Sequence, residues 1–217
     1  MKLLDIPIFL AKENAPHILT SNHIDMLLGY PNASTRSRAI VTLVEHGALK
    51  KACRGIYFNS LSNYDKAEIL SFVIPAGALS MASVLGRAGV TNNPSQHLHV
   101  VVPLDTPGFG RNNKELDDGT RILIHSIPKN FLTFGAGKMG RFNAATPEKA
   151  LCDWLYLSKS PRSDVTDVPD DIDMLDFIDT VKLAEFAKIM DVEDRLQDLL
   201  NRQADSEKYY QNARSMF

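Results

Sequence analysis

The chain has 217 residues, of which 44% are hydrophobic and 23% are charged, and its formal net charge is -2 at pH 7. These values suit a globular chain with one large domain, or with a small domain followed by a larger one. The slightly acidic total argues against a protein that coats nucleic acid indiscriminately.

The opening apolar run does not resemble an export signal. It contains Asp5 and Pro7 and lacks a small-residue cleavage site. The longest uncharged stretch, residues 69–86, only reaches the lower edge of a membrane span. Cys53 and Cys152 have no ligand-spaced partners, which indicates two free thiols in a reducing cytosol. We therefore expect a cytoplasmic protein with no membrane partner, no metal and no cofactor.

Three short helices are predicted before residue 50. Proline or a capping side chain begins each helix, and a glycine or a polar turn ends it. The predicted helices cover residues 5–13, 22–28 and 35–46. Thr20 or Ser21 caps the second helix, and Ser34 caps the third.

A short hairpin follows the third helix. Its two strands lie within residues 49–58, and Arg54 and Gly55 form the tight turn between them. Three small helices followed by a hairpin are typical of a winged helix-turn-helix, which we place at residues 1–60. The polar, turn-rich stretch that comes next is the predicted seam to a second domain at residues 61–217.

The second domain is predicted to mix helices and strands. In chain order we expect helices at 65–73 and 77–86, strands at 98–102 and 121–127, a helix from Thr146, and two amphipathic tail helices at 172–190 and 192–215. In the helix that begins at Thr146, we interpret Glu148 and Lys149 as solvated and Trp154 as buried. The fold class is therefore α+β, with an N-terminal winged helix-turn-helix followed by a mixed α/β C-terminal domain that ends in a helical tail.

The outward face of the third helix supplies the candidate base-reading residues. The second helix of a helix-turn-helix lies in the major groove, so its outward side chains must reach base edges. With Ile40 at the centre of the buried stripe, steps of about 100° per residue place three side chains on the opposite side. The predicted base contacts are Thr35, Arg38 and Thr42.

Basic side chains around this helix supply the candidate phosphate contacts. Residues 31–60 hold five Arg and Lys residues with Glu45 as their only acidic neighbour, whereas the tail after Ser163 is rich in aspartate. A local basic surface binds phosphates despite an acidic total. Besides Arg38, the predicted DNA contacts are Arg36 in the first turn of the helix and Lys50, Lys51 and Arg54 in the hairpin.

Sequence patterns that would indicate an enzyme are weaker than those that indicate DNA binding. The glycine-rich residues 135–138 lack the earlier glycine and the following Ser or Thr of a phosphate-binding loop. Asp171 and Asp173 have the spacing of a magnesium-binding pair, but no Gly-Ser loop precedes them, and the stretch is rich in aspartate. His97 and His99 share one face of a predicted strand, with no third ligand suggested nearby. We therefore predict a protein that is not an enzyme.

Three segments of the chain resemble the AbiEi antitoxins. They are residues 38–57 (RAIVTLVEHGALKKACRGIY), 78–85 (ALSMASVL) and 145–153 (ATPEKALCD). The match runs in order from about residue 19 to residue 157, and the TPEKAL string is its most specific part. The acidic tail after Ser158 and the polar pair Asn112-Asn113 depart from the family pattern.

The resemblance implies a winged-helix transcriptional repressor encoded beside a nucleotidyltransferase-like toxin, AbiEii, in a type IV toxin-antitoxin module linked to phage defence. Such a protein would bind the double-stranded DNA of its own promoter, repress its operon and counteract the toxin without a need for direct contact. An alternative from another class is a winged-helix adaptor that docks a protein and does not bind DNA. That alternative predicts a stable protein complex and no salt-sensitive affinity for DNA.

Overall fold

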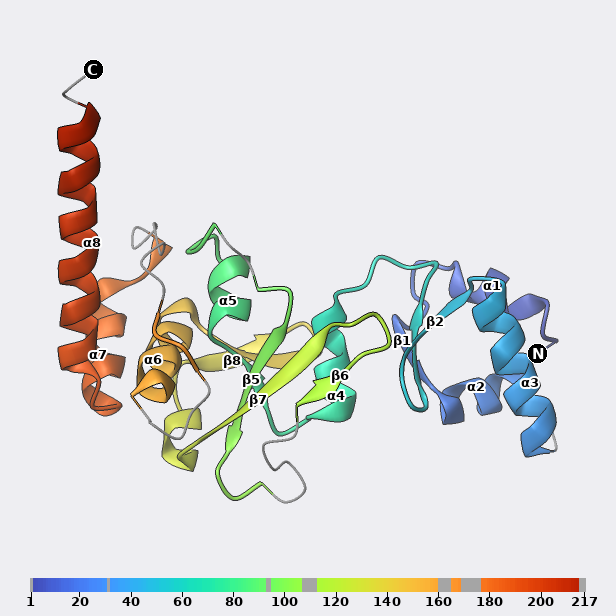
Figure 1. Cartoon of the computed structure of the whole chain (residues 1–217). Coiled ribbons are helices and arrows are strands. Elements are labelled where there is room, and N and C mark those ends of the chain that lie inside the picture. Colours follow the sequence, from blue (N-terminus) through green and yellow to red (C-terminus); the bar gives the residue numbers. More distant parts are fainter. Residues whose placement is uncertain are drawn as a thin grey trace. The chain divides into compact units, whose positions relative to one another are not determined.

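A computed structural model describes residues 2–30, 32–92, 95–106, 113–159, 165–168 and 177–214 (Figure 1). The fold is mixed α+β, and the chain divides into two compact units. The first unit is Met1–Phe72 with Glu115–Thr120, and the second unit is Val73–Lys114 with Arg121–Phe217. The first unit therefore extends beyond the boundary predicted at residue 60, and it includes a segment that is distant in the chain.

The first unit contains the three predicted helices and the hairpin in the predicted order, together with a short strand before α2 and two short helical segments after the hairpin. Its elements are α1 (Asp5–Leu10), β1 (Ile18–Thr20), α2 (Ser21–Leu28), α3 (Ala33–Glu45), β2 (Leu49–Cys53), β3 (Ile56–Asn59), η1 (Lys66–Ile69) and α4 (Leu70–Val73), the last of which ends at the boundary of the unit. The strands form an antiparallel sheet in the order β1-β3-β2. Strand β1 was not predicted, because a strand of three residues is too short to show an alternating pattern.

Capping side chains fix where α2 and α3 begin. Thr20 caps α2, because its Oγ1 accepts from the His23 amide at 3.2 Å while His23 Nδ1 accepts from the Thr20 amide at 3.3 Å. Asn32 caps α3, because its Oδ1 accepts from the Thr35 amide at 2.8 Å. The predicted cap at Ser34 is therefore wrong. Ser34 lies inside the first turn of α3 and donates its hydroxyl to Asn32.

The core of the first unit lies between its helices and one face of its sheet. It combines apolar residues of α1, α2 and α3 with Leu49 and Tyr57 of the hairpin. Helix α3 contributes Ala39, Ile40 and Leu43, whose spacing of one, three and four residues places them on one side of the helix. This core fixes which side of α3 stays in solvent.

A six-stranded mixed sheet forms the centre of the second unit. Its elements are β4 (Ala78–Leu79), α5 (Ala82–Arg87), β5 (Leu98–Pro103), β6 (Lys114–Glu115), β7 (Arg121–Ile127), η2 (Lys129–Leu132), β8 (Ala136–Met139), β9 (Phe142–Ala145), α6 (Pro147–Ser158), α7 (Thr180–Ile189) and α8 (Glu193–Arg214). The strand order is β6-β7-β5-β4-β9-β8, with β5 parallel to β7 and β4 parallel to β9. Figure 1 shows α8 beside α7 and running on past it.

The predicted strands of the second unit are confirmed as β5 and β7. The helix predicted at 77–86 is wrong in its first part, because Ala78 and Leu79 pair with a strand on each side. Helix α5 begins only after Met81, whose φ of 53° turns the chain out of the strand. Local composition could not reveal this strand, since its partners lie far away in the sequence.

Helix α6 begins at the predicted cap, but two of its charged residues are buried. Glu148 is 7% exposed and Lys149 is 1% exposed. The Lys149 ammonium pairs with the Asp153 carboxylate one turn later, and Ser80 Oγ donates to Asp153 Oδ2 at 2.7 Å. Glu148 Oε1 accepts from the Asp179 amide at 3.1 Å, next to the start of α7. The interpretation of Glu148 and Lys149 as solvated is therefore wrong.

The described ranges contain no helix that is both long and apolar enough to cross a membrane. Within these same ranges, no three His, Cys, Asp or Glu side chains are grouped in a way that could hold a metal ion. Burial raises the pKa of the Cys152 thiol to about 12. This thiol is therefore protonated at neutral pH and is a poor nucleophile.

Candidate nucleic-acid interface

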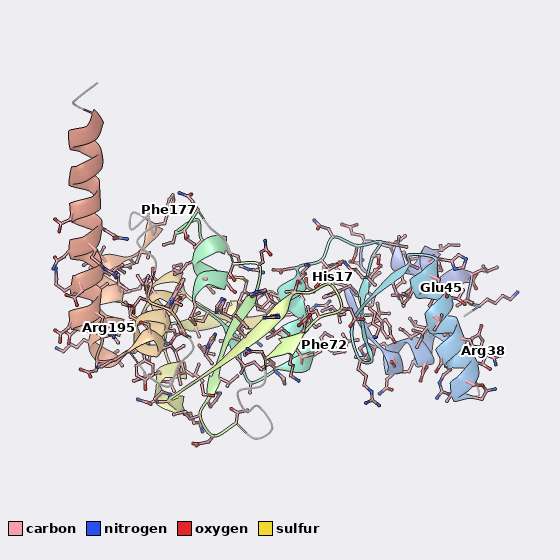
Figure 2. All side chains as sticks on the ribbon, in the orientation of Figure 1. His17, Arg38, Glu45, Phe72, Phe177 and Arg195 are labelled. Carbon is pink, nitrogen blue, oxygen red and sulfur yellow. The ribbon has the colours of Figure 1, made fainter. Side chains whose placement is uncertain are left out.

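The solvent-facing side of α3 is mostly polar. Its exposed residues are Ala33, Ser34, Thr35, Ser37, Arg38, Val41 and Glu45. Figure 2 shows Arg38 and Glu45 on this helix. Because Ala39, Ile40 and Leu43 are all buried, the centre of the exposed face lies between Arg38 and Val41. Short side chains around one arginine allow a helix to approach base edges closely in a major groove, which is about 12 Å wide.

The predicted base contacts differ in their exposure. Thr35 and Arg38 are exposed, whereas Thr42 is half-buried. The Thr42 hydroxyl donates to the Arg38 carbonyl at 3.1 Å, so its proton is used inside the helix. Its oxygen can still accept a hydrogen bond. Thr35 and Arg38 are thus the better placed of the three.

Ser34 and Val41 were not predicted to belong to the exposed face. The predicted centre of the buried stripe was Ile40, whereas the buried set of α3 also includes Ala39 and Leu43. When the directions of all three buried side chains around the helix axis are averaged, the exposed side of the helix is centred closer to Val41. The Val41 side chain is 52% exposed. An exposed apolar side chain on such a face can contact the methyl group of thymine.

Arg36, a predicted phosphate contact, has partners inside the first unit. Its Nε lies 2.9 Å from Asp25 Oδ2 on α2, and one of its terminal nitrogens donates to the Tyr30 carbonyl at 3.3 Å. The side chains of this ion pair are each 29% exposed. Arg36 therefore connects α3 to α2 and to the turn between them.

The two hairpin lysines lie on opposite faces of the sheet. In the register of β2 and β3, Lys50 pairs with Phe58 and Lys51 pairs with Tyr57. Paired residues in antiparallel strands point to the same side, and successive residues alternate. Since Tyr57 belongs to the core beneath the helices, Lys51 lies on the side of the sheet that carries α3. Lys50 lies on the other side.

The hairpin turn is next to the start of α2. The Gly55 carbonyl accepts from the Ser21 amide at 2.9 Å. Gly55 has a φ of +76°, which places Arg54 and Gly55 in a tight turn that favours glycine. Arg54 is exposed at this turn. The turn therefore presents a cation near an amino-terminal helix end, which itself carries partial positive charge.

Most of the predicted DNA-contacting cations have no acidic partner within the described part of the chain. Among the described residues, no ion pair or side-chain hydrogen bond engages the charged groups of Arg38, Lys50 and Arg54. Lys51 differs, because its Nζ lies 3.0 Å from Asp117 Oδ2. A hydrogen bond from Lys51 to this carboxylate raises the pKa of Lys51. Of the four exposed cations predicted to contact DNA, Lys51 therefore has an anionic partner, and the other three have none among the described residues.

The residues weighed for enzyme chemistry do not assemble into one site. Residues 136–139 form strand β8, and Asp171 and Asp173 lie outside the described residues. His99 lies on β5, and its Nδ1 is 3.3 Å from Nε2 of His125 on β7. Burial and then the neighbouring His125 and His97 lower the pKa of His99 to about 4. At neutral pH His99 is therefore uncharged.

Comparison with known proteins finds a likeness among solved structures. No family model and no curated protein matches the chain. Three chains of solved structures match it. One is the crystal structure of the RV2827C protein from Mycobacterium tuberculosis, with 16% sequence identity and a TM-score of 0.54, covering 92% of this chain and 80% of that chain. At this identity the likeness shows a shared mixed α+β fold along most of both chains.

Proposed function

We propose that the first unit is a winged helix-turn-helix that binds double-stranded DNA. In this proposal α2 and α3 form the helix-turn-helix, α3 enters the major groove, and β2 and β3 form the wing. One observation carries the proposal. The exposed face of α3 holds Arg38 among short side chains, with Glu45 at the end of the helix, and the same small unit exposes further cations on its hairpin.

The side chains divide into two roles. Arg38 reads a guanine edge through two hydrogen bonds, and Thr35 and Thr42 contact neighbouring bases. Lys50, Lys51 and Arg54 bind backbone phosphates, which fix the register of the protein on the duplex but carry no sequence information. Arg36 supports these contacts by holding α3 against α2.

At the level of the cell, we propose a repressor that regulates its own operon and serves as the antitoxin of a type IV toxin-antitoxin module. The support is the ordered resemblance of residues 38–57, 78–85 and 145–153 to the AbiEi antitoxins. The toxin would be a nucleotidyltransferase-like protein, and its effect is counteracted without a need for direct contact. The chain itself is proposed to have no enzymatic activity.

A mobility-shift titration with DNA from upstream of the protein's own gene tests the DNA-binding proposal. We expect tighter binding to this DNA than to a scrambled duplex of equal length, and weaker binding as salt rises. Lys50→Ala and Arg54→Ala should weaken binding to both duplexes, and each should flatten the salt slope by about 0.9 because each removes one phosphate contact. A wild-type chain that does not bind DNA, yet retains a partner protein in a pull-down, would favour the adaptor alternative.

A further inference from the structure

The segment Glu115–Thr120 of the first unit forms a tight turn that is docked on the hairpin. The Leu116 amide donates to the Thr120 carbonyl at 2.8 Å, and the Gly119 amide donates to the Leu116 carbonyl at 2.9 Å. Leu116 is only 3% exposed, so it anchors the turn. The Asp117 amide donates to the Ala52 carbonyl at 2.9 Å. This bond uses a carbonyl of β2, which is an edge strand in the order β1-β3-β2.

Two neighbouring aspartates of this turn hold two different lysines. Asp118 Oδ2 lies 2.6 Å from Lys66 Nζ, which also donates to Thr120 Oγ1 at 3.1 Å. Asp117 Oδ2 lies 3.0 Å from Lys51 Nζ. The Asp118–Lys66 ion pair attaches the turn to η1. The Asp117–Lys51 ion pair involves a lysine that is predicted to bind DNA.

The position of Lys51 makes its acidic partner relevant to DNA binding. Of the two hairpin lysines, Lys51 is the one on the side of the sheet that carries α3. Its side chain is 49% exposed, so a phosphate can reach it from solvent. A phosphate that approaches this ammonium also approaches the Asp117 carboxylate, and the two anions repel each other. Among the described residues, Arg38, Lys50 and Arg54 carry no such competitor.

We propose that Asp117 sets the DNA affinity of the first unit by competing with a backbone phosphate for Lys51. The inference rests on the proposed DNA-binding function and adds one affinity-determining residue to it. In the free protein the carboxylate neutralises this cation. On DNA, the phosphate must displace Asp117 before Lys51 can contribute a contact. The turn stays in place during this exchange, because Leu116 and the Asp118 contact hold it independently.

Salt-dependent mobility-shift titrations of Asp117→Asn on the upstream DNA test this proposal. Removing the carboxylate should raise the affinity about two- to fivefold near 0.1 M salt, because the phosphate no longer has to displace Asp117 from the exposed ammonium of Lys51. The salt slope should stay close to the wild-type value, because Lys51 contacts the same phosphate in both complexes. The Asp117 amide still donates to Ala52 in this variant, so the turn is kept, and a thermal melt checks this. The matched control is Asp198→Asn, which neutralises an exposed aspartate on α8.

A Lys51→Ala background separates the local effect from a general change in charge. If Asp117 acts through Lys51, Asp117→Asn has no further effect once Lys51 is replaced by alanine. An unchanged or reduced affinity of Asp117→Asn would overturn the inference, as would an equal gain in the Lys51→Ala background or in Asp198→Asn. Failure of the proposed function is distinguishable, because the wild-type chain and every variant would then lack affinity for DNA.

Discussion

Arg36 on α3 and Asp25 on α2 form an ion pair, with Nε of the arginine 2.9 Å from Oδ2 of the aspartate. Arg36 also donates to the carbonyl of Tyr30, between the two helices. One side chain thus joins α2, α3 and their connecting turn. Since a recognition helix must keep a fixed orientation relative to the rest of its motif, this contact bears on DNA reading as well as on stability.

We expect Arg36→Ala and Asp25→Asn to lower the free energy of unfolding by similar amounts, about 0.5–1 kcal/mol each, because the pair is partly exposed to water. Urea denaturation followed by circular dichroism measures both variants. The salt slope of DNA binding should remain at the wild-type value in each. A slope reduced by about 0.9 in Arg36→Ala alone would instead assign Arg36 a direct phosphate contact.

Arg38→Ala should mainly reduce discrimination between DNA sequences. Arg38 is the only cation on the exposed face of α3 within the described residues. Loss of a two-bond contact to guanine costs about 1–3 kcal/mol on the correct sequence and little on other DNA. Competition mobility shifts with upstream and scrambled duplexes measure the ratio of the two affinities. Lys188→Ala, which removes an exposed cation from α7, is the control and should leave the ratio unchanged.

The parts of the fold that depend on local chemistry were predictable from the sequence. Thr20 was one of two predicted caps for α2, and the Thr146-Pro147 start of α6 was predicted correctly. Caps are readable because the capping side chain and the amide it bonds are only two or three residues apart. The strands β5 and β7 were readable because their β-branched residues are bounded by turn signals.

The parts that depend on distant partners were not predictable. Ala78 and Leu79 form a strand only because β5 and β9 pair with them on both sides. Lys149 is buried because Asp153 is one turn away and Ser80 arrives from a distant strand end. In the candidate interface, Asp117 pairs with Lys51 although the two residues are more than sixty positions apart in the sequence. No local pattern in residues 49–58 indicates that one of two adjacent lysines has an acidic partner.

The buried pair of Lys149 and Asp153 should dominate the stability of the second unit. Burial raises the pKa of Asp153, while Lys149 and then Ser80 favour its charged form. Lys149→Met leaves the carboxyl in the core without its cation, which should cost about 3–5 kcal/mol of the free energy of unfolding. Thermal and urea denaturation measure this loss. Lys182→Met, which removes an exposed lysine paired with Asp179 on the surface, should lower the free energy of unfolding far less, because water screens this ion pair.

A double variant, Lys149→Met with Asp153→Leu, checks that the loss comes from the unpaired carboxyl. Replacing both charged groups by apolar ones removes the desolvation penalty, so part of the stability should return. Ser80 loses its acceptor in this variant, which limits the recovery. A double variant that is less stable than Lys149→Met would show that the ion pair is not the source of the effect.

Asp118 should make the stability of the first unit depend on pH in the acidic range. Partial burial acts to raise the pKa of this carboxyl, but hydrogen bonds from Lys66 and Thr120 outweigh it and lower the pKa from 3.8 to about 2. A carboxyl with a lower pKa in the folded chain stabilises that state above the unfolded pKa, and the stabilisation is lost as the pH falls towards the folded pKa. The expected window is therefore between about pH 4 and pH 2.

We expect Asp118→Asn to lower the free energy of unfolding by about 1 kcal/mol at neutral pH. The full lowering of the pKa corresponds to about 2.5 kcal/mol, and solvent screening at this surface turn reduces it. Urea denaturation at a series of pH values from 7 down to 2.5 should show the difference from wild type shrinking below about pH 4. Asp105→Asn, at an exposed position of the second unit, should show no such convergence. A contribution from the charge of Asp118 must disappear once the carboxyl is protonated in both the folded and the unfolded chain. If the difference in free energy of unfolding between wild type and Asp118→Asn stays constant down to the lowest pH, Asp118 therefore stabilises the turn through its shape.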